Sequence, residues 1–157
     1  MADRPTDHPA DHPADHPAVS PLAVPAAGSV ALLGTRFDAD GVTALRHRVA
    51  LCAATAGLRG ERLDDFVLAV YELLTNAVRH GGGQGTLQLW HDPKSVTCEV
   101  IDTGGGFELA TAGHPAVPPV PARPGGWGLF LADKLTDTIE MASGPHGTTV
   151  RVSSALT

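Results

Sequence analysis

The stretch Glu72-Leu-Leu-Thr-Asn-Ala-Val-Arg-His80 is the most informative part of this chain. It ends a segment, from about Glu61 to His80, whose apolar residues recur at helical spacing, so we predict an amphipathic helix there. Glu72 and Asn76 are one turn apart and face the same way, opposite the apolar stripe. A carboxylate and an amide therefore project from one helical surface. The stripe consists of Leu63, Phe66, Val67, Val70, Leu74, Ala77 and Val78.

A strand and a first helix are predicted before this segment. The change to apolar residues between Val30 and Phe37 is typical of an opening strand, and Asp38 or Asp40 can cap the helix that follows. Gly57 is suited to end that helix. Its apolar positions, at roughly helical spacing, are Val42, Leu45, Val49, Leu51 and Cys52.

Two strands, a loop, a helix and two more strands are predicted after His80. The alternating segments 86–90 and 96–101 indicate a hairpin. Residues 103–125 are too rich in glycine and proline for regular structure, and a loop of that length is often a lid. Helical spacing returns at 126–135, and two strand-like segments close the chain. The order is therefore strand, two helices, two strands, lid, helix and two strands.

Composition limits the function classes. A chain of 157 residues with 43% hydrophobic content can hold one domain with a real core but hardly two. A net charge of −6 without a basic run argues against partners bound through nucleic-acid phosphates or acidic membranes. Cys52 and Cys98 have no zinc-ligand spacing, so we expect reduced thiols. Without a signal peptide or a membrane-spanning stretch, we expect a cytoplasmic protein.

The N-terminal segment has a different composition from the rest. Residues 7–18 repeat Asp-His-Pro-Ala three times, and proline and alanine continue to Ala27. Such a segment cannot bury enough apolar surface to fold, so we predict a disordered tail over 1–27 and one domain over 28–157. The regularly spaced histidines of the repeat are interpreted as part of a solvated extension in preference to a metal site.

Several glycines follow the predicted helix, and their context separates them from better-known nucleotide motifs. A P-loop needs a lysine after its glycines, and here none follows a glycine-rich turn. A Rossmann fingerprint runs from strand through glycines directly into a helix, whereas Gly104 to Gly106 lead into the long loop. Asp102, at a strand end before these glycines, is suited to accept a hydrogen bond from an exocyclic amine such as adenine N6.

Four motifs, taken together, resemble the N, G1 and G2 boxes of the GHKL (HATPase-type) superfamily, which includes gyrase and histidine kinases. The resemblance covers about residues 29–153 and implies an α+β fold: a two-layer α/β sandwich whose mixed, largely antiparallel sheet has helices on one face. The motifs are Glu72 to His80, Asp102-Thr-Gly-Gly-Gly-Phe107, Gly125-Gly-Trp-Gly-Leu129 and Gly147-Thr-Thr149.

Each motif has a chemical role that its residues can perform. Glu72 can act as the base for an attacking hydroxyl, and Asn76 can offer an oxygen to Mg²⁺. Asp102 is assigned to the adenine of ATP, and by analogy with the family Thr148 reaches the same end of the pocket. The remaining ligand-binding positions are backbone positions, where glycine lets the chain approach a ligand or begins a helix that favours phosphate: Gly104, Gly106, Gly126 and Gly128.

Within the superfamily, the chain looks most like the bacterial anti-sigma-factor serine/threonine kinases. Two segments carry this resemblance, Glu72 to His80 and Gly147-Thr-Thr-Val-Arg151. That resemblance implies a kinase that uses ATP and Mg²⁺, binds a sigma factor and phosphorylates a STAS-type anti-sigma antagonist. It also suggests a homodimer. Two alternatives stay open: a non-catalytic ATP-binding regulatory module, and a detached histidine-kinase catalytic domain, whose phosphoprotein would be acid-labile.

Overall fold

A computed structural model describes residues 25, 27–104 and 126–156. The predicted tail lies almost entirely outside the described residues, and so does most of the predicted lid, from 105 to 125. The described elements follow the predicted order, with one 3-10 turn, η1, added. They are β1 (Val30–Asp38), η1 (Ala39–Gly41), α1 (Val42–Ala56), α2 (Gly60–His80), β2 (Gln84–His91), β3 (Ser95–Asp102), α4 (Gly126–Leu135), β4 (Thr138–Gly144) and β5 (Gly147–Ala155).

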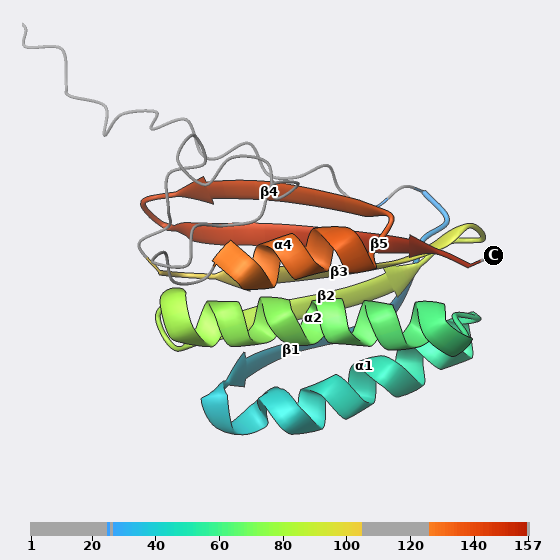
Figure 1. The fold of residues 1–157 in the computed structure, drawn as a ribbon, viewed down its shortest axis with the longest axis horizontal. Helices are drawn as coiled ribbons and strands as arrows, with labels where there is room; N and C mark the ends of the chain where they lie inside the picture. The colour runs from blue at the N-terminus through green and yellow to red at the C-terminus, as the bar shows by residue number, and fades with distance from the viewer. Residues whose placement is uncertain (1–24, 26, 105–125, 157) are drawn as a thin grey trace, which may run out of the picture.

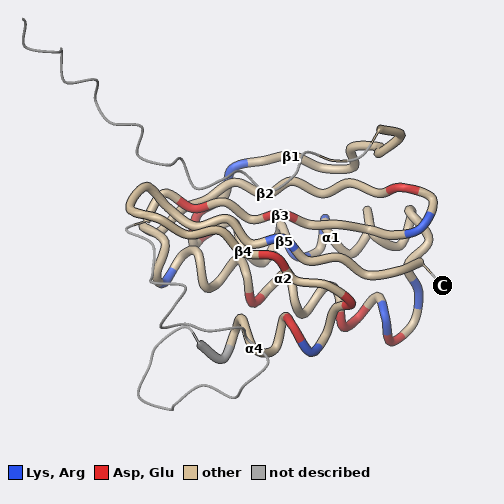
Figure 2. The backbone as a smooth tube through the Cα atoms, turned by 90° about the horizontal axis from the view of Figure 1, so that it is seen from above, with Lys and Arg blue, Asp and Glu red and all other residues tan. Residues whose placement is uncertain are grey.

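The strands form one sheet in the order β1-β2-β3-β5-β4, and each of its four pairings is antiparallel. Of the residues that the structure describes, the helices α1, α2 and α4 lie together on one face of this sheet, as Figures 1 and 2 show. The predicted α+β fold, a two-layer sandwich with helices on one face, is therefore confirmed. An antiparallel register matters for the site because directly paired residues point to the same face.

Local sequence explains where the first helix begins and ends. Asp38 accepts a hydrogen bond from the Gly41 N–H at 3.1 Å and so caps the turn that leads into α1. Gly57 adopts the left-handed conformation, with φ of +118°, and its N–H bonds the last helical carbonyls. Both residues had been expected in these roles, with Asp40 as the alternative cap.

The core lies between the sheet and the helices. α2 buries the side chains of Phe66, Val70 and Leu74 completely, and these pack against the inner residues of the strands. β3 is the central strand and is buried along most of its length, whereas in β5 only alternate residues, those on the helix-covered face, are buried. The strand residues in this core include Leu87, Leu89, Val96, Cys98, Val100, Val150 and Val152.

Leu51 was expected on the apolar side of α1, and that expectation is wrong: the residue is 71% exposed. The buried positions of α1 are Val42, Leu45, Val49 and Ala53. Leu51 is two residues, about 200° of helical rotation, from Val49 and therefore points away from the sheet. Cys52 lies at the margin of the core, where its thiol is 3.9 Å from the Leu32 carbonyl oxygen.

The opposite face of the sheet carries a charged row. The Arg151 guanidinium is 2.6 Å from the Glu99 carboxylate and 3.7 Å from that of Glu140, and these residues are register partners across β3, β5 and β4. Arg151 also lies 5.2 Å from the ring centre of Trp90, which is buried. The residues of the row alternate along the strands with those of the core, so the row joins three strands on the face opposite the core.

Both cysteines are free thiols, as expected. Cys98 is fully buried in the core, and burial raises the pKa of its thiol far above the usual range. Such a thiol stays protonated and behaves as a small apolar side chain. Among the described residues, no helix is both long and apolar enough to span a membrane.

The contrast between two leucines of α1 provides a test of this packing. Leu45 is 3% exposed, so Leu45→Ala should lower the free energy of unfolding by about 2 to 5 kcal/mol, because it leaves a cavity in the core. Leu51→Ala makes the same chemical change on the same helix but should alter stability by less than about 0.5 kcal/mol. Urea unfolding followed by circular dichroism measures both, and equal effects would refute the assigned helix orientation.

Candidate functional site

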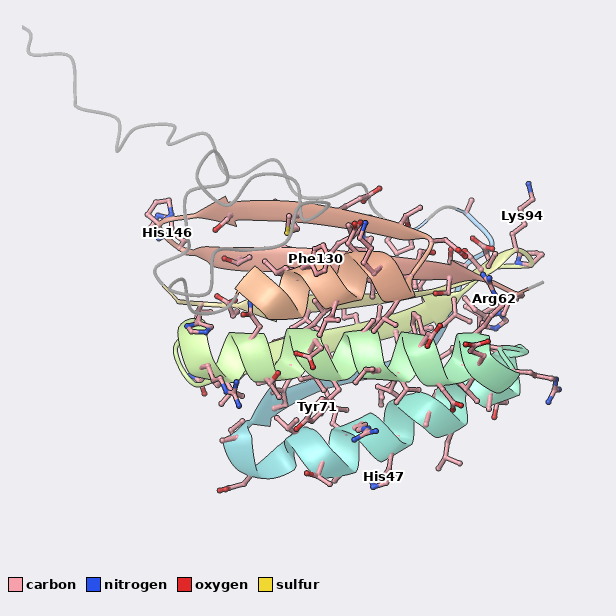
Figure 3. All side chains as sticks on the ribbon, viewed as in Figure 1. His47, Arg62, Tyr71, Lys94, Phe130 and His146 are labelled. Carbon is pink, nitrogen blue, oxygen red and sulfur yellow. The ribbon has the colours of Figure 1, made fainter. Side chains whose placement is uncertain are left out.

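Most of the residues selected from the sequence meet at one end of the domain. β3 ends there at Asp102, β5 begins there with Gly147 and Thr148, and α2 ends there at His80. α4 begins at the same end, which is on the left in Figure 1. His146, labelled in Figure 3, lies exposed in the adjacent β4–β5 turn. The antiparallel order of the sheet therefore brings together motifs that are far apart in sequence.

Asp102 is held by two backbone groups from different segments. Its Oδ1 accepts hydrogen bonds from the Gly104 N–H at 3.0 Å and from the Thr148 N–H at 3.2 Å. The residue is 9% exposed, and this burial raises the pKa of the carboxyl group, while the two N–H donors act in the opposite direction. Within the described residues, no hydrogen bond to Oδ2 is recorded. This second oxygen can therefore accept a hydrogen bond from a ligand.

Glycines let three stretches of backbone close around Asp102. A Cβ atom on Gly81 would overlap the Asp102 side chain and lie 2.6 Å from the Ala77 carbonyl oxygen. On Gly104, a Cβ would lie 2.6 Å from the Gly81 Cα. Gly147 has φ of +138° and packs against the Asp102 carbonyl group. The end of α2, the segment after β3 and the start of β5 thus enclose one carboxylate at distances that only glycine allows.

Thr148 lies beside Asp102 on the helix-covered face. It is 4% exposed, and its hydroxyl oxygen is 2.8 Å from that of Ser143. Asp102 is the register partner of Thr148, which is in turn the partner of Ser143. A carboxylate and two hydroxyls therefore form a row across β3, β5 and β4. Ser143 was not among the residues selected from the sequence, because only the strand register reveals its place.

Glu72 lies against the first turn of α4. A Cβ on Gly128 would be 3.2 Å from Glu72 Oε2 and 3.6 Å from the Glu72 carbonyl oxygen. Glu72 and Asn76 are both half-buried, because α4 packs on this flank of α2. They lie away from the main stripe but not on an open surface, because both side chains are half-buried. No hydrogen bond of Asn76 is recorded within the part of the chain that the structure describes.

The first turn of α4 offers anion-binding groups. Gly126 is its first residue, as the sequence predicted, and the N–H groups of a first helical turn have no partner within the helix. Such groups and the helix dipole favour negative charge. Glu72 and Gly128 therefore place a proton acceptor beside a potential phosphate site. Gly106, which was also selected, lies outside the described residues.

The two parts of the site lie toward the end of α2. Gly81, beside Asp102, is nine positions after Glu72, beside α4, which corresponds to about 13.5 Å along the helix axis. An elongated ligand with a hydrogen-bond donor at one end and an anion at the other matches this arrangement. Among the described residues, no group of three His, Cys, Asp or Glu side chains is placed to hold a metal. The Asn76 amide oxygen is a suitable single ligand for Mg²⁺, which otherwise coordinates phosphates and water.

A separate hollow of about 350 Å³ lies between the end of β1 and α1. Arg36 and Arg48 are among its lining residues, and it contains none of the residues that surround Asp102 or Glu72. The chemistry described above therefore belongs to the end of α2 and not to this hollow.

Comparison with known proteins points to the superfamily that the four motifs resemble. Residues 35–154 match the family described as histidine kinase-like ATPase domain. The chain is 30% identical over 100 residues to the serine-protein kinase RsbW of Listeria monocytogenes, a match that covers 57% of this chain and 64% of that protein. It is 29% identical over 96 residues to RsbW of Oceanobacillus iheyensis, covering 54% and 61%. The matches thus span less than two thirds of these relatives' length.

A solved structure shares the fold. It contains the RsbU and RsbW domains of a Mycobacterium tuberculosis protein and superposes with a TM-score of 0.56 at 21% identity, covering 78% of this chain and 32% of that one. The family match extends from β1 to β5 and includes Glu72, Asp102 and Thr148. The resemblance to the GHKL superfamily is confirmed, and this chain belongs to the histidine kinase-like ATPase domain family.

Proposed function

We propose that this chain is a protein kinase that transfers the γ-phosphoryl group of ATP to a serine or threonine of a STAS-type anti-sigma antagonist, and that it also binds the sigma factor. The observation that carries the proposal is the pairing of two sites along α2: a buried carboxylate whose Oδ2 accepts no hydrogen bond from the described residues, and a glutamate at the start of α4. The names of the RsbW relatives support the choice of serine as acceptor.

The adenine end of ATP is assigned to Asp102. Oδ1 is already used by two backbone N–H groups, so Oδ2 is the oxygen that would accept the adenine N6 amine. Gly104 and Gly147 allow the backbone to enclose the base pocket. The buried environment strengthens this hydrogen bond because little water competes for the carboxylate.

The phosphate end is assigned to Glu72, Asn76 and the first turn of α4. Glu72 would accept the proton of the attacking hydroxyl, while the N–H groups around Gly126 and Gly128 would orient the phosphates. Bound Mg²⁺, with Asn76 as a ligand, would supply neutralisation of the phosphate charge. Positioning and electrostatics supply most of the rate enhancement in such transfers.

The proposed setting is the cytoplasm, where a sigma factor and its antagonist would meet the kinase, which we propose acts as a homodimer. Sequential binding of the two partners would let phosphorylation of the antagonist decide which of them is held. The disordered tail proposed for residues 1–27 and the lid proposed around 103–125 lie largely outside the described residues, and Gly106 remains a proposed contact.

Asp102→Asn should weaken ATP binding by about 10- to 100-fold, which is the value of one charge-assisted hydrogen bond. An asparagine can keep its oxygen toward Gly104 and Thr148, but it then presents an amide N–H₂ where the adenine amine needs an acceptor. Calorimetric titration with ATP and Mg²⁺ measures the change. Asp92→Asn is the matched control, because Asp92 also accepts two backbone N–H groups, those of Lys94 and Ser95, in the turn between β2 and β3. Unchanged affinity in Asp102→Asn would remove the adenine assignment.

Glu72→Gln should bind ATP with nearly normal affinity and lose phosphoryl transfer by about 10²- to 10⁴-fold, because the amide cannot accept the proton. Transfer from radiolabelled ATP is measured to each anti-sigma antagonist of the source genome, expressed singly. Glu61→Gln, in the exposed first turn of the same helix, should retain activity. Retained transfer by Glu72→Gln would exclude its role as base.

The nature of the phosphoprotein distinguishes the proposed kinase from its alternatives. An acid-stable product on serine or threonine supports the proposal. An acid-labile product would identify a detached histidine-kinase domain, and ATP binding without transfer to any antagonist would identify a non-catalytic module.

A further inference from the structure

A polar clip, formed by Arg62, Asp137 and Ala155, lies at the end of the domain opposite Asp102 and has no role in the function described so far. Arg62 is in the first turn of α2, Asp137 follows α4, and Ala155 ends β5. The Arg62 Nη2 donates to Asp137 Oδ2 at 2.5 Å, and its Nε donates to the Ala155 carbonyl oxygen at 3.1 Å. Figure 3 shows Arg62 at the opposite end of the domain from His146.

Asp137 fixes the C-terminal end of α4 to the sheet. Its N–H donates to the Ser153 carbonyl oxygen at 2.9 Å, and its Oδ2 accepts the Ala155 N–H at 2.6 Å. Because α4 ends only two positions earlier, at Leu135, this end of the helix has little freedom to move relative to β5. Arg62 attaches the first turn of α2 to the same point. The helices α2 and α4 therefore share one anchor.

The same two helices meet again at the proposed phosphate end of the site. There Gly128, in the first turn of α4, lies against Glu72, so the helices run antiparallel between two contacts. Glu72 is ten positions after Arg62, about 15 Å along α2. Gly128 is seven positions before the last residue of α4, about 10.5 Å, and the link to Asp137 can span the remaining distance. Both helices thus measure the same length from the clip to the Glu72–Gly128 contact.

The clip and the apolar packing differ in how well they fix a position along the helix axis. Apolar packing of α4, which buries Leu129 and Ala132, sets its distance from α2 but resists sliding only weakly. Hydrogen bonds depend on direction and length and tolerate little displacement. Three of them meet in the clip. The clip is therefore the contact that best defines the axial position of α4 on α2.

We propose that Arg62 is a positioning residue: by fixing α2 to Asp137, it sets the position of α4 along α2 and so holds the first turn of α4 against Glu72. This inference rests on the proposed function, because it takes Glu72 and that turn as the phosphate end of an ATP site. Arg62 acts through α4 and not by contact with the nucleotide. Its side chain is 44% exposed and that of Asp137 is 48% exposed, and such ion pairs contribute little to global stability.

Arg59 provides a matched control. It is the N-cap residue of α2, three positions before Arg62, and is also exposed. Within the described part of the chain, no hydrogen bond or ion pair of the Arg59 side chain is recorded. Arg59→Met therefore removes the same charge from the same end of the domain without touching the clip. Arg62→Met removes both hydrogen bonds of Arg62 and keeps an unbranched side chain, whereas Arg62→Lys keeps one donor for Asp137.

Native-state hydrogen exchange, followed by mass spectrometry, tests the clip without any ligand. Arg62→Met should raise the exchange rates of the α4 amides about three- to tenfold, the usual effect of one exposed ion pair and its hydrogen bond, and leave those of β2 unchanged. Arg62→Lys should restore most of the protection, and Arg59→Met should match the unmodified protein. Equal exchange of α4 in Arg62→Met and the unmodified protein would refute the inference.

Kinetics test the link to the phosphate end. Arg62→Met should lower kcat for phosphoryl transfer to the antagonist about three- to tenfold, because α4 is then held less often in the position that transfer requires. Its affinity for adenosine, which has no phosphates, should stay that of the unmodified protein, since Asp102 is held by Gly104 and Thr148. Arg62→Lys should recover most of the rate. A parallel loss of adenosine affinity would show general loosening of the domain and overturn the positioning role.

The outcomes separate the two hypotheses. If the unmodified protein transfers phosphate and Arg62→Met keeps its kcat although α4 exchanges faster, the positioning role is refuted while the kinase proposal stands. If the unmodified protein neither binds ATP nor transfers phosphate, the proposed function fails, and the positioning role fails with it. Circular dichroism of each variant shows that the fold is intact, so that a lower kcat reports the position of α4 and not unfolding.

Discussion

The buried carboxylate of Asp102 is the constraint on which the site depends. A carboxylate that leaves water must be compensated by hydrogen bonds, and here the compensation comes from the backbone N–H groups of Gly104 and Thr148. Those groups reach one oxygen only because Gly81, Gly104 and Gly147 lack the side chains that would keep the segments apart. Three glycines, two of them from the sequence motifs and one directly after α2, therefore serve the same carboxylate, and no hydrogen bond from the described residues occupies its other oxygen.

The antiparallel sheet extends this constraint to neighbouring strands. Once Asp102 is paired with Thr148, the tight β4–β5 turn, Pro145–His146, places Ser143 opposite Thr148 on the same face. The same register on the other face places Glu99, Arg151 and Glu140 in a row whose ion pairs join the same three strands. If one strand slipped by one residue along its neighbour, its side chains in both rows would move to the wrong faces of the sheet. The charged row and the polar row therefore favour the same strand register.

Sequence reasoning identified the elements well because each had a local origin. The stripe of α2 and the glycine after α1 are properties of short segments, and the structure has both. Leu51 was misplaced because an apolar residue near a helical stripe was counted in it without regard to its angle, which puts it on the exposed side. Ser143 and the contact of Glu72 with Gly128 were missed for a different reason: both depend on which distant segments pack together, and a single sequence does not contain that information.

Different interactions hold the two ends of the site, the one at Asp102 and the one at Glu72. The Asp102 end is fixed by strand register and by directional hydrogen bonds, which tolerate little displacement. The Glu72 end is fixed by the packing of α4 against α2, an apolar contact that accommodates sliding of one helix along another more easily. A displacement of α4 would separate Glu72 from Gly128 while leaving Asp102 and its donors in place. If the two ends act as proposed, base recognition and phosphoryl transfer are separable in this fold, and a partner that contacts α4 would change the rate of transfer without changing which nucleotide is bound.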